Sequence, residues 1–189
     1  MRQKDTFKLI LATFAIFLIL LPPLAALNSL LTQALNTAGW YRPIQEHVVP
    51  WEARLVSVTI SLVGIQSKVI PNSKIANFYM VKDGAMLPVD LAWNCLGWQS
   101  ALLLGVSLAA GLRGRFTHFS RLKCVIFGLF GTLLVNIFRM SFIATGIYYI
   151  NSLFGMIVHD YFAAFITMLW LFFFWWFSYG FVLEEKHAQ

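Results

Sequence analysis

The sequence contains few charged residues. Asp, Glu, Lys and Arg make up 12% of its 189 residues, whereas 59% are hydrophobic, and the mean hydropathy is +0.73. An ordinary soluble domain has a charged fraction of about 25%. This composition excludes such a protein and indicates an integral membrane protein whose residues 1–189 form a single domain.

Cysteine is also scarce, and the sequence has no grouped metal-binding residues. The two cysteines, Cys95 and Cys124, have no nearby partner in the sequence. The topology derived below places them on opposite faces of the membrane, which excludes a disulfide between them. Neither a metal-ligand spacing nor a Gly-rich phosphate loop is visible. The sequence therefore predicts no metal and no cofactor.

The net charge of +6 does not indicate a nucleic-acid-binding protein. The basic residues form short groups between apolar runs, whereas a nucleic-acid interface needs a continuous basic stripe. Their placement instead follows the rule that cytoplasmic loops of membrane proteins carry Lys and Arg. We therefore expect the cell (inner or cytoplasmic) membrane as the location, and no nucleic-acid partner.

The first apolar run predicts a transmembrane helix over residues 1–31. It follows Arg2, Lys4 and Lys8, which place the N-terminus in the cytoplasm, and Pro22-Pro23 interrupts or kinks it. A cleaved signal peptide within residues 1–27 is the alternative. Either interpretation places the next segment outside the cytoplasm.

Residues 32–94 form this extracytoplasmic segment, the least apolar part of the chain. Residues 50–65 show both helical and alternating periodicity, and Pro50 with Glu52 in the first turn favours a helix on the outer membrane surface. Residues 75–81 and 86–91 flank Lys82-Asp83-Gly84, which predicts a β-hairpin.

Three more apolar runs predict transmembrane helices over residues 91–112, 124–149 and 159–183. The loop between the first two is strongly basic and is therefore cytoplasmic, as is the C-terminus. The basic residues of that loop are Arg113, Arg115, Arg121 and Lys123. The predicted fold class is an all-α, multi-pass integral membrane protein with about four transmembrane helices, an outer-surface helix and a short hairpin.

This topology brings three chemically active residues to one membrane level. Arg139 lies 15 residues beyond Cys124, which is about 22 Å along a helix that runs outward. Cys95 and His159 begin the outer ends of the neighbouring predicted helices. We therefore expect a thiol, a guanidinium and an imidazole to meet near the outer face.

Each of the three residues also has a structural interpretation. An Arg inside an apolar helix indicates a functional site, although Arg139 could instead snorkel to the interface or pair with Asp90 or Asp160 for packing. His159 beside Asp160 could cap its helix, and a free Cys is commonly a small buried hydrophobic residue, as we expect for Cys124.

Together the three residues suit a thiol-dependent acyl transferase. A neighbouring cation or imidazolium lowers the pKa of a thiol, so Cys95 could serve as the nucleophile that forms an acyl-thioester. His159 could then act as general acid/base. Arg139 could stabilise the oxyanion or bind the substrate carbonyl, and these two roles stay open.

The motifs around these residues resemble those of the exosortase and archaeosortase family of membrane transpeptidases. Residues 95–100 match its C-x-G-x-x-S pattern with Cys95, Gly97 and Ser100, Asn136 and Arg139 match its N-x-x-R, and His159 matches its third catalytic position. The resemblance covers about residues 51–183, and the His favours the exosortase type. Many members have about eight membrane helices, whereas this chain has about four.

The resemblance implies a thiol protease or transpeptidase that acts in protein sorting. Its substrates would be secreted proteins with a short C-terminal motif, a transmembrane helix and a basic tail, and the acceptor would be a lipid or another surface molecule. A partner subunit could replace the missing helices. Besides the three catalytic positions, the candidate supporting residues are Asn136, Gly97, Ser100, Asp160 and Asp90.

Two other classes of function are possible. A non-enzymatic subunit of a transport or polysaccharide-export assembly would use Arg139 as a counter-ion, and replacement of Cys95 by alanine would then be silent. An intramembrane serine protease is disfavoured because the sequence has no G-x-S-x-G element.

Overall fold

The computed structural model describes residues 30, 32–34, 36–39, 41–70, 76–114 and 116–184. The chain divides into two compact units, residues 1–41 and residues 42–189, and the elements below belong to the second unit apart from Tyr41. The transmembrane helix predicted for residues 1–31 and the alternative signal peptide lie outside the described residues, except for Leu30, which is helical.

A helical segment opens the larger unit. It consists of α2 (Tyr41–Pro43), the π-helical turn η1 (Ile44–Val48) and α3 (Val49–Ser61). α3 has a proline in its first turn, where the missing N–H is harmless. It ends before Gly64, whose φ of 82° only glycine adopts readily. The helix predicted for residues 50–65 is therefore confirmed, with an end four residues earlier.

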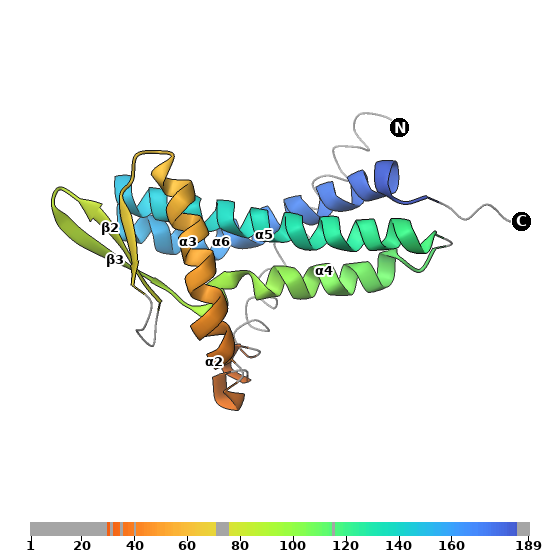
Figure 1. The fold of residues 1–189 in the computed structure, drawn as a ribbon, viewed down its shortest axis with the longest axis horizontal. Coiled ribbons are helices and arrows are strands. Elements are labelled where there is room, and N and C mark those ends of the chain that lie inside the picture. Colours follow the sequence, from red (N-terminus) through yellow and green to blue (C-terminus); the bar gives the residue numbers. More distant parts are fainter. Residues whose placement is uncertain are drawn as a thin grey trace, which may run out of the picture. The chain divides into compact units, whose positions relative to one another are not determined.

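One face of α3 is buried at helical spacing, and its buried residues are Val49, Glu52, Ala53, Val56 and Ile60. This face packs against α5 (His118–Tyr149) and against the sheet. Figure 1 shows α3 crossing the two longest helices at a steep angle. Glu52 is the one buried carboxylate on this otherwise apolar face.

A three-stranded antiparallel sheet follows, with β1 (Ser67–Ile70), β2 (Ala76–Lys82) and β3 (Ala85–Leu91) in the order β1-β2-β3. Asp83 and Gly84 form the tight turn between β2 and β3, both with positive φ, as a two-residue hairpin requires. The predicted hairpin is confirmed. The strand β1 was not predicted, because four residues are too few to show a clear alternation.

The remaining elements are the 3₁₀ turn η2 (Trp93–Leu96), α4 (Trp98–Gly111), α5, α6 (Ser152–Phe177) and the π-helical turn η3 (Ser178–Val182). Figure 1 shows α4 lying alongside α5, with the sheet at the opposite end of α5 from its N-terminus. A hydrogen bond of 2.6 Å from Lys82 Nζ to Tyr148 O ties the hairpin to that end.

The predicted starts of all three later helices were wrong. Residue 91 is the last residue of β3, so the helix predicted from there begins only at Trp98. α5 begins six residues before Cys124, because Thr117 caps it by accepting a hydrogen bond from Ser120 N. α6 begins at Ser152, because Asn151 Oδ1 accepts from Phe154 N at 2.8 Å, and the loop predicted for residues 151–158 is mostly helical.

Within the described part of the chain, two helical stretches are long and apolar enough to cross a membrane, His118–Tyr149 and Ala164–Val182. The stretch Ala164–Val182 lies within the predicted span 159–183, and His118–Tyr149 contains the predicted span 124–149 but begins six residues before it. α4 has 14 residues, about 21 Å, whereas a membrane core is roughly 30 Å thick. The structure is thus mostly helical with a small sheet and two candidate spans.

The bundle core lies between α4, α5 and α6, where Leu104, Leu108, Cys124 and Phe174 form one buried cluster. A Cβ on Gly131 would lie 2.1 Å from the Trp170 ring, so only glycine lets α6 pack this closely on α5. Cys124 is completely buried in this core, in agreement with its predicted role as a small hydrophobic residue.

Candidate active site

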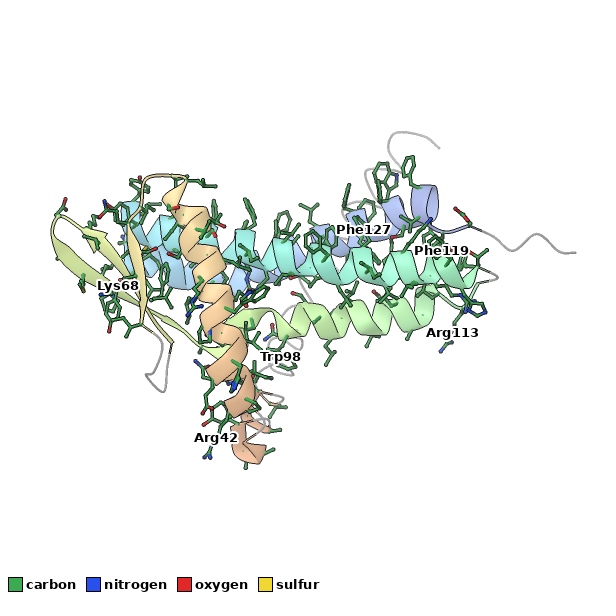
Figure 2. The ribbon with its side chains drawn as sticks, in the orientation of Figure 1. Arg42, Lys68, Trp98, Arg113, Phe119 and Phe127 are labelled. Atoms are coloured by element: carbon green, nitrogen blue, oxygen red, sulfur yellow. The ribbon has the colours of Figure 1, made fainter. Side chains whose placement is uncertain are left out.

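Cys95 lies in a short connection between the sheet and the bundle. It is part of η2, and Gly97 then turns the chain into α4 with a left-handed φ of 68°. Trp98, the first residue of α4, is labelled in Figure 2 where α4 begins beside α3. The Cys95 N–H donates to Ala92 O at 2.8 Å, which closes the 3₁₀ turn and fixes the backbone of Cys95.

The carbonyl oxygen of Cys95 accepts two hydrogen bonds from α5. Arg139 Nη2 donates at 2.7 Å and Asn136 Nδ2 donates at 3.2 Å. Residues three apart on a helix share a face, so the N-x-x-R spacing suits a double contact with one oxygen. In this structure the guanidinium therefore holds the backbone of the candidate nucleophile.

The thiol of Cys95 faces the imidazole of His159 from α6. Their Sγ and Nε2 atoms are 3.8 Å apart, within hydrogen-bonding range for sulfur, and Asn94 Oδ1 lies 3.7 Å from the same Sγ. Cys95 and His159 are both partly exposed, so a reactant can reach the thiol. The structure thus brings the thiol, guanidinium and imidazole of the sequence analysis into one site.

The candidate supporting residues separate into three groups. Asn136 contacts Cys95 directly, and Gly97 allows this approach, because a Cβ there would lie 2.7 Å from Asn136 Oδ1. The Ser100 hydroxyl instead hydrogen bonds to Thr167 Oγ1 at 2.8 Å and joins α4 to α6. The side chains of Asp90 and Asp160 lie outside the described part of the structure.

Glu52 is a residue of the site that the sequence analysis did not identify. Its side chain is 4% exposed, and its Oε1 accepts a hydrogen bond from Asn136 Nδ2. Burial raises the pKa of this carboxyl, although the hydrogen bond from Asn136 and the charge of Arg139 oppose that rise. A signal was available, because Glu52 falls on the same apolar helical face as Val49 and Val56.

A cavity of about 10 Å³ lies between α3 and the Cys95 turn, with room for about one water molecule. Glu52 and Cys95 both line it, and the rest of its wall is almost entirely apolar: Val49, Ala53, Val56, Leu91, Ala92, Leu96 and Met140. An extended peptide cannot fit there. A peptide would have to reach the thiol from its other, partly exposed side.

The surroundings of Cys95 favour its thiolate. Burial of the thiol raises its pKa, but hydrogen bonds with His159 and the Ala92 backbone and the charges of His159 and Arg139 lower it by more. The net pKa of Cys95 lies below its usual value. The thiolate fraction at neutral pH is therefore larger than that of a free cysteine.

We expect this lowered pKa to appear in the pH dependence of alkylation. In a Cys124→Ala background, iodoacetamide should react with Cys95 with a midpoint below the free-cysteine value of about 8.5. His159→Ala should move that midpoint upward, because it removes the main group that favours the thiolate. His118→Ala, at the exposed start of α5, is the control and should leave the midpoint unchanged. An unchanged midpoint in His159→Ala would contradict the assigned contact.

No family model, no curated protein and no solved structure matches this chain. Within the described residues, no group of three or more His, Cys, Asp or Glu side chains could hold a metal ion.

Proposed function

We propose that the chain is a membrane-embedded cysteine protease or transpeptidase that cleaves C-terminal sorting signals of secreted proteins and transfers the product to a surface or lipid acceptor. The observation that carries the proposal is the 3.8 Å separation of Cys95 Sγ and His159 Nε2, with Arg139 Nη2 fixed on the Cys95 carbonyl. A thiol beside an imidazole, on a backbone held by a cation, is suited to acyl transfer.

In the first step, the Cys95 thiolate attacks the carbonyl carbon of the scissile peptide bond. The new S–C bond forms, the C–N bond breaks, and protonated His159 donates its proton to the leaving amine. The product is an acyl-thioester on Cys95. In the second step, a hydroxyl or amine of the acceptor attacks the thioester, His159 takes its proton, and the Cys95 thiolate leaves.

Arg139 has two tasks in this proposal. Its Nη2 contact holds the peptide that carries the nucleophile. Its Nε is buried and has no hydrogen-bond partner among the described residues, so it would donate to the substrate carbonyl or the oxyanion if substrate binding makes it accessible. A donor in such a poorly solvated site stabilises developing negative charge more strongly than one in water.

The surface of the two long helices supports a membrane location. Large apolar side chains on α6 point outward, including Phe165, Phe172 and Trp176, which are 55–76% exposed. Contact of such an apolar surface with water is unfavourable, whereas contact with lipid is not, so the surface suits a membrane. In Figure 2, Arg113 lies where α4 ends and α5 begins, and Lys68 lies on the sheet at the other end of α5. The basic residues at the α4–α5 connection suit the cytoplasmic face of the membrane. In the proposed topology both termini are also cytoplasmic, and the active site lies on the outer side.

The proposed substrate class follows from the resemblance to exosortases and archaeosortases. Residues 95–100 carry C-x-G-x-x-S, and Asn136 with Arg139 carries N-x-x-R. The substrates would have a short C-terminal motif, a transmembrane helix and a basic tail. With about four transmembrane helices in the proposed topology, a partner subunit would complete substrate docking.

The experiment that tests this function traps the acyl-enzyme. Membranes that contain the protein are incubated with a co-encoded tail-anchored protein, and we expect a hydroxylamine-sensitive adduct on Cys95, found by mass spectrometry of the Cys95 peptide. The Cys124→Ala variant should form the same adduct. If no co-encoded substrate gives an adduct and Cys95→Ser leaves the phenotype intact, the subunit hypothesis replaces this one.

A further inference from the structure

Glu52 is a buried charged group whose place in the site the proposed mechanism does not explain. It lies on the apolar face of α3 and is 4% exposed. A carboxylate in such a position is strongly unfavourable unless hydrogen bonds and an opposite charge compensate it. Both are present, because Asn136 Nδ2 donates to Glu52 Oε1 and the charge of Arg139 acts on the same carboxylate.

The Asn136 amide connects this carboxylate to the nucleophile. Its Nδ2 donates to Glu52 Oε1 and to the carbonyl oxygen of Cys95, so the described contacts use both hydrogens of the amide. An ionised carboxylate only accepts hydrogen bonds, and so does a carbonyl. A flipped amide would place Oδ1 against two acceptors. Glu52 and the Cys95 carbonyl therefore together determine which way the Asn136 amide points.

The orientation of this amide affects the thiol because the contact between Cys95 and His159 is already long. At 3.8 Å, the Sγ–Nε2 separation is close to the limit for a hydrogen bond to sulfur. Two donors, Asn136 Nδ2 and Arg139 Nη2, hold the Cys95 carbonyl. Loss of one donor frees the short turn η2, and a small displacement is then enough to separate thiol and imidazole.

We infer that Glu52 is a positioning residue, which orients the Asn136 amide and balances the charge of Arg139 so that the Cys95 thiol stays in contact with His159. The inference rests on the proposed function, which assigns catalytic roles to Cys95 and His159. It assigns to α3, which is remote in sequence from the three candidate catalytic residues, an influence on thiol reactivity that acts through Asn136 and Arg139.

The test measures how strongly His159 affects Cys95 with and without Glu52. Alkylation of Cys95 by iodoacetamide at pH 7 is followed in a Cys124→Ala background. His159→Ala should slow it by about tenfold, because loss of the imidazole raises the thiol pKa and so lowers the thiolate fraction. In a Glu52→Ala background the same substitution should slow it by less than about twofold. The ratio of the alkylation rates with His159 and with His159→Ala should be intermediate in Glu52→Gln, because the glutamine amide allows Asn136 to flip. If Glu52→Ala does not fold, Glu52→Gln alone decides the test.

Two controls separate positioning from a general loss of stability. Val56→Ala removes buried volume from the same face of α3 and lines the same cavity, so it should lower stability but keep the tenfold ratio. Glu46→Gln removes an exposed carboxylate of η1 and should also keep it. Equal ratios in wild type, Glu52→Gln and Glu52→Ala would overturn the inference. The alkylation test uses no substrate, so its result is independent of the acyl-enzyme trap. The positioning role of Glu52 and the proposed transpeptidase function can therefore each fail without the other.

Discussion

Replacement of Cys95 by alanine should abolish cleavage of a tail-anchored substrate, with a fall in rate of at least about 10³-fold. The reason is that removal of a nucleophile eliminates the covalent intermediate, and the remaining groups of the site cannot form another. Cleavage is measured in membranes by the change in mass of a tagged substrate. Cys124→Ala is the matched control and should retain nearly the wild-type rate, because Cys124 is buried in the α4–α5–α6 core.

The competing hypothesis makes the opposite prediction for the same variant. A non-enzymatic subunit would tolerate Cys95→Ala, while changes at Arg139 would still impair its assembly. Substrate processing that persists in Cys95→Ala membranes at the wild-type rate would therefore remove the case for an enzyme. Loss of processing with a normal amount of folded protein would remove the case for a purely structural subunit.

Replacement of Arg139 by lysine should lower the cleavage rate by about 10²-fold or more, while the protein still folds. Lysine retains the positive charge that compensates Glu52, but it has no planar fork of donors and cannot reproduce the 2.7 Å contact with the Cys95 carbonyl. Arg139→Leu should in addition destabilise the fold, by about 3–5 kcal/mol, because it leaves the buried carboxylate uncompensated. Rates and thermal melting of the detergent-solubilised protein distinguish the two effects.

A second arginine on α5 provides the control. Arg121 Nη2 donates to Gly114 O at 2.8 Å, so it also binds a backbone carbonyl, but near the opposite end of the helix. Arg121→Lys should therefore leave the cleavage rate close to that of the wild type. A cleavage rate for Arg139→Lys equal to that of Arg121→Lys would show that Arg139 acts only as a charge.

Hydropathy predicted which helices and strands form better than it predicted the residues at which they begin and end. The long apolar runs and the Asp83-Gly84 turn are local signals, so the two long helices and the hairpin could be predicted. The starts of α5 and α6 depend on the side chains of Thr117 and Asn151, which lie outside the apolar runs. Residue 91 is apolar because it is buried as the end of β3, and composition alone cannot separate such a strand from the start of a helix.

The sequence predicted the three candidate catalytic residues because each is unusual where it stands in an apolar chain. Glu52 was interpreted only as an acidic residue in the first turn of a helix, where it commonly interacts with the helix dipole. The helical spacing from Val49 to Val56 places Glu52 on the buried face of α3, but its contact with Asn136 depends on the crossing of α3 and α5, which no local pattern contains. Ser100 was a candidate supporting residue from its motif, and its hydroxyl instead hydrogen bonds to Thr167.

The small apolar cavity behind Cys95 has a consequence for the fate of an acylated thiol. Its walls, which include Val56 and Met140, leave space for about one water molecule. A thioester on Cys95 would therefore contact little water on the α3 side. If Cys95 becomes acylated, the lifetime of the ester depends on which nucleophile arrives past His159, and a poorly hydrated lipid boundary there would favour transfer over hydrolysis.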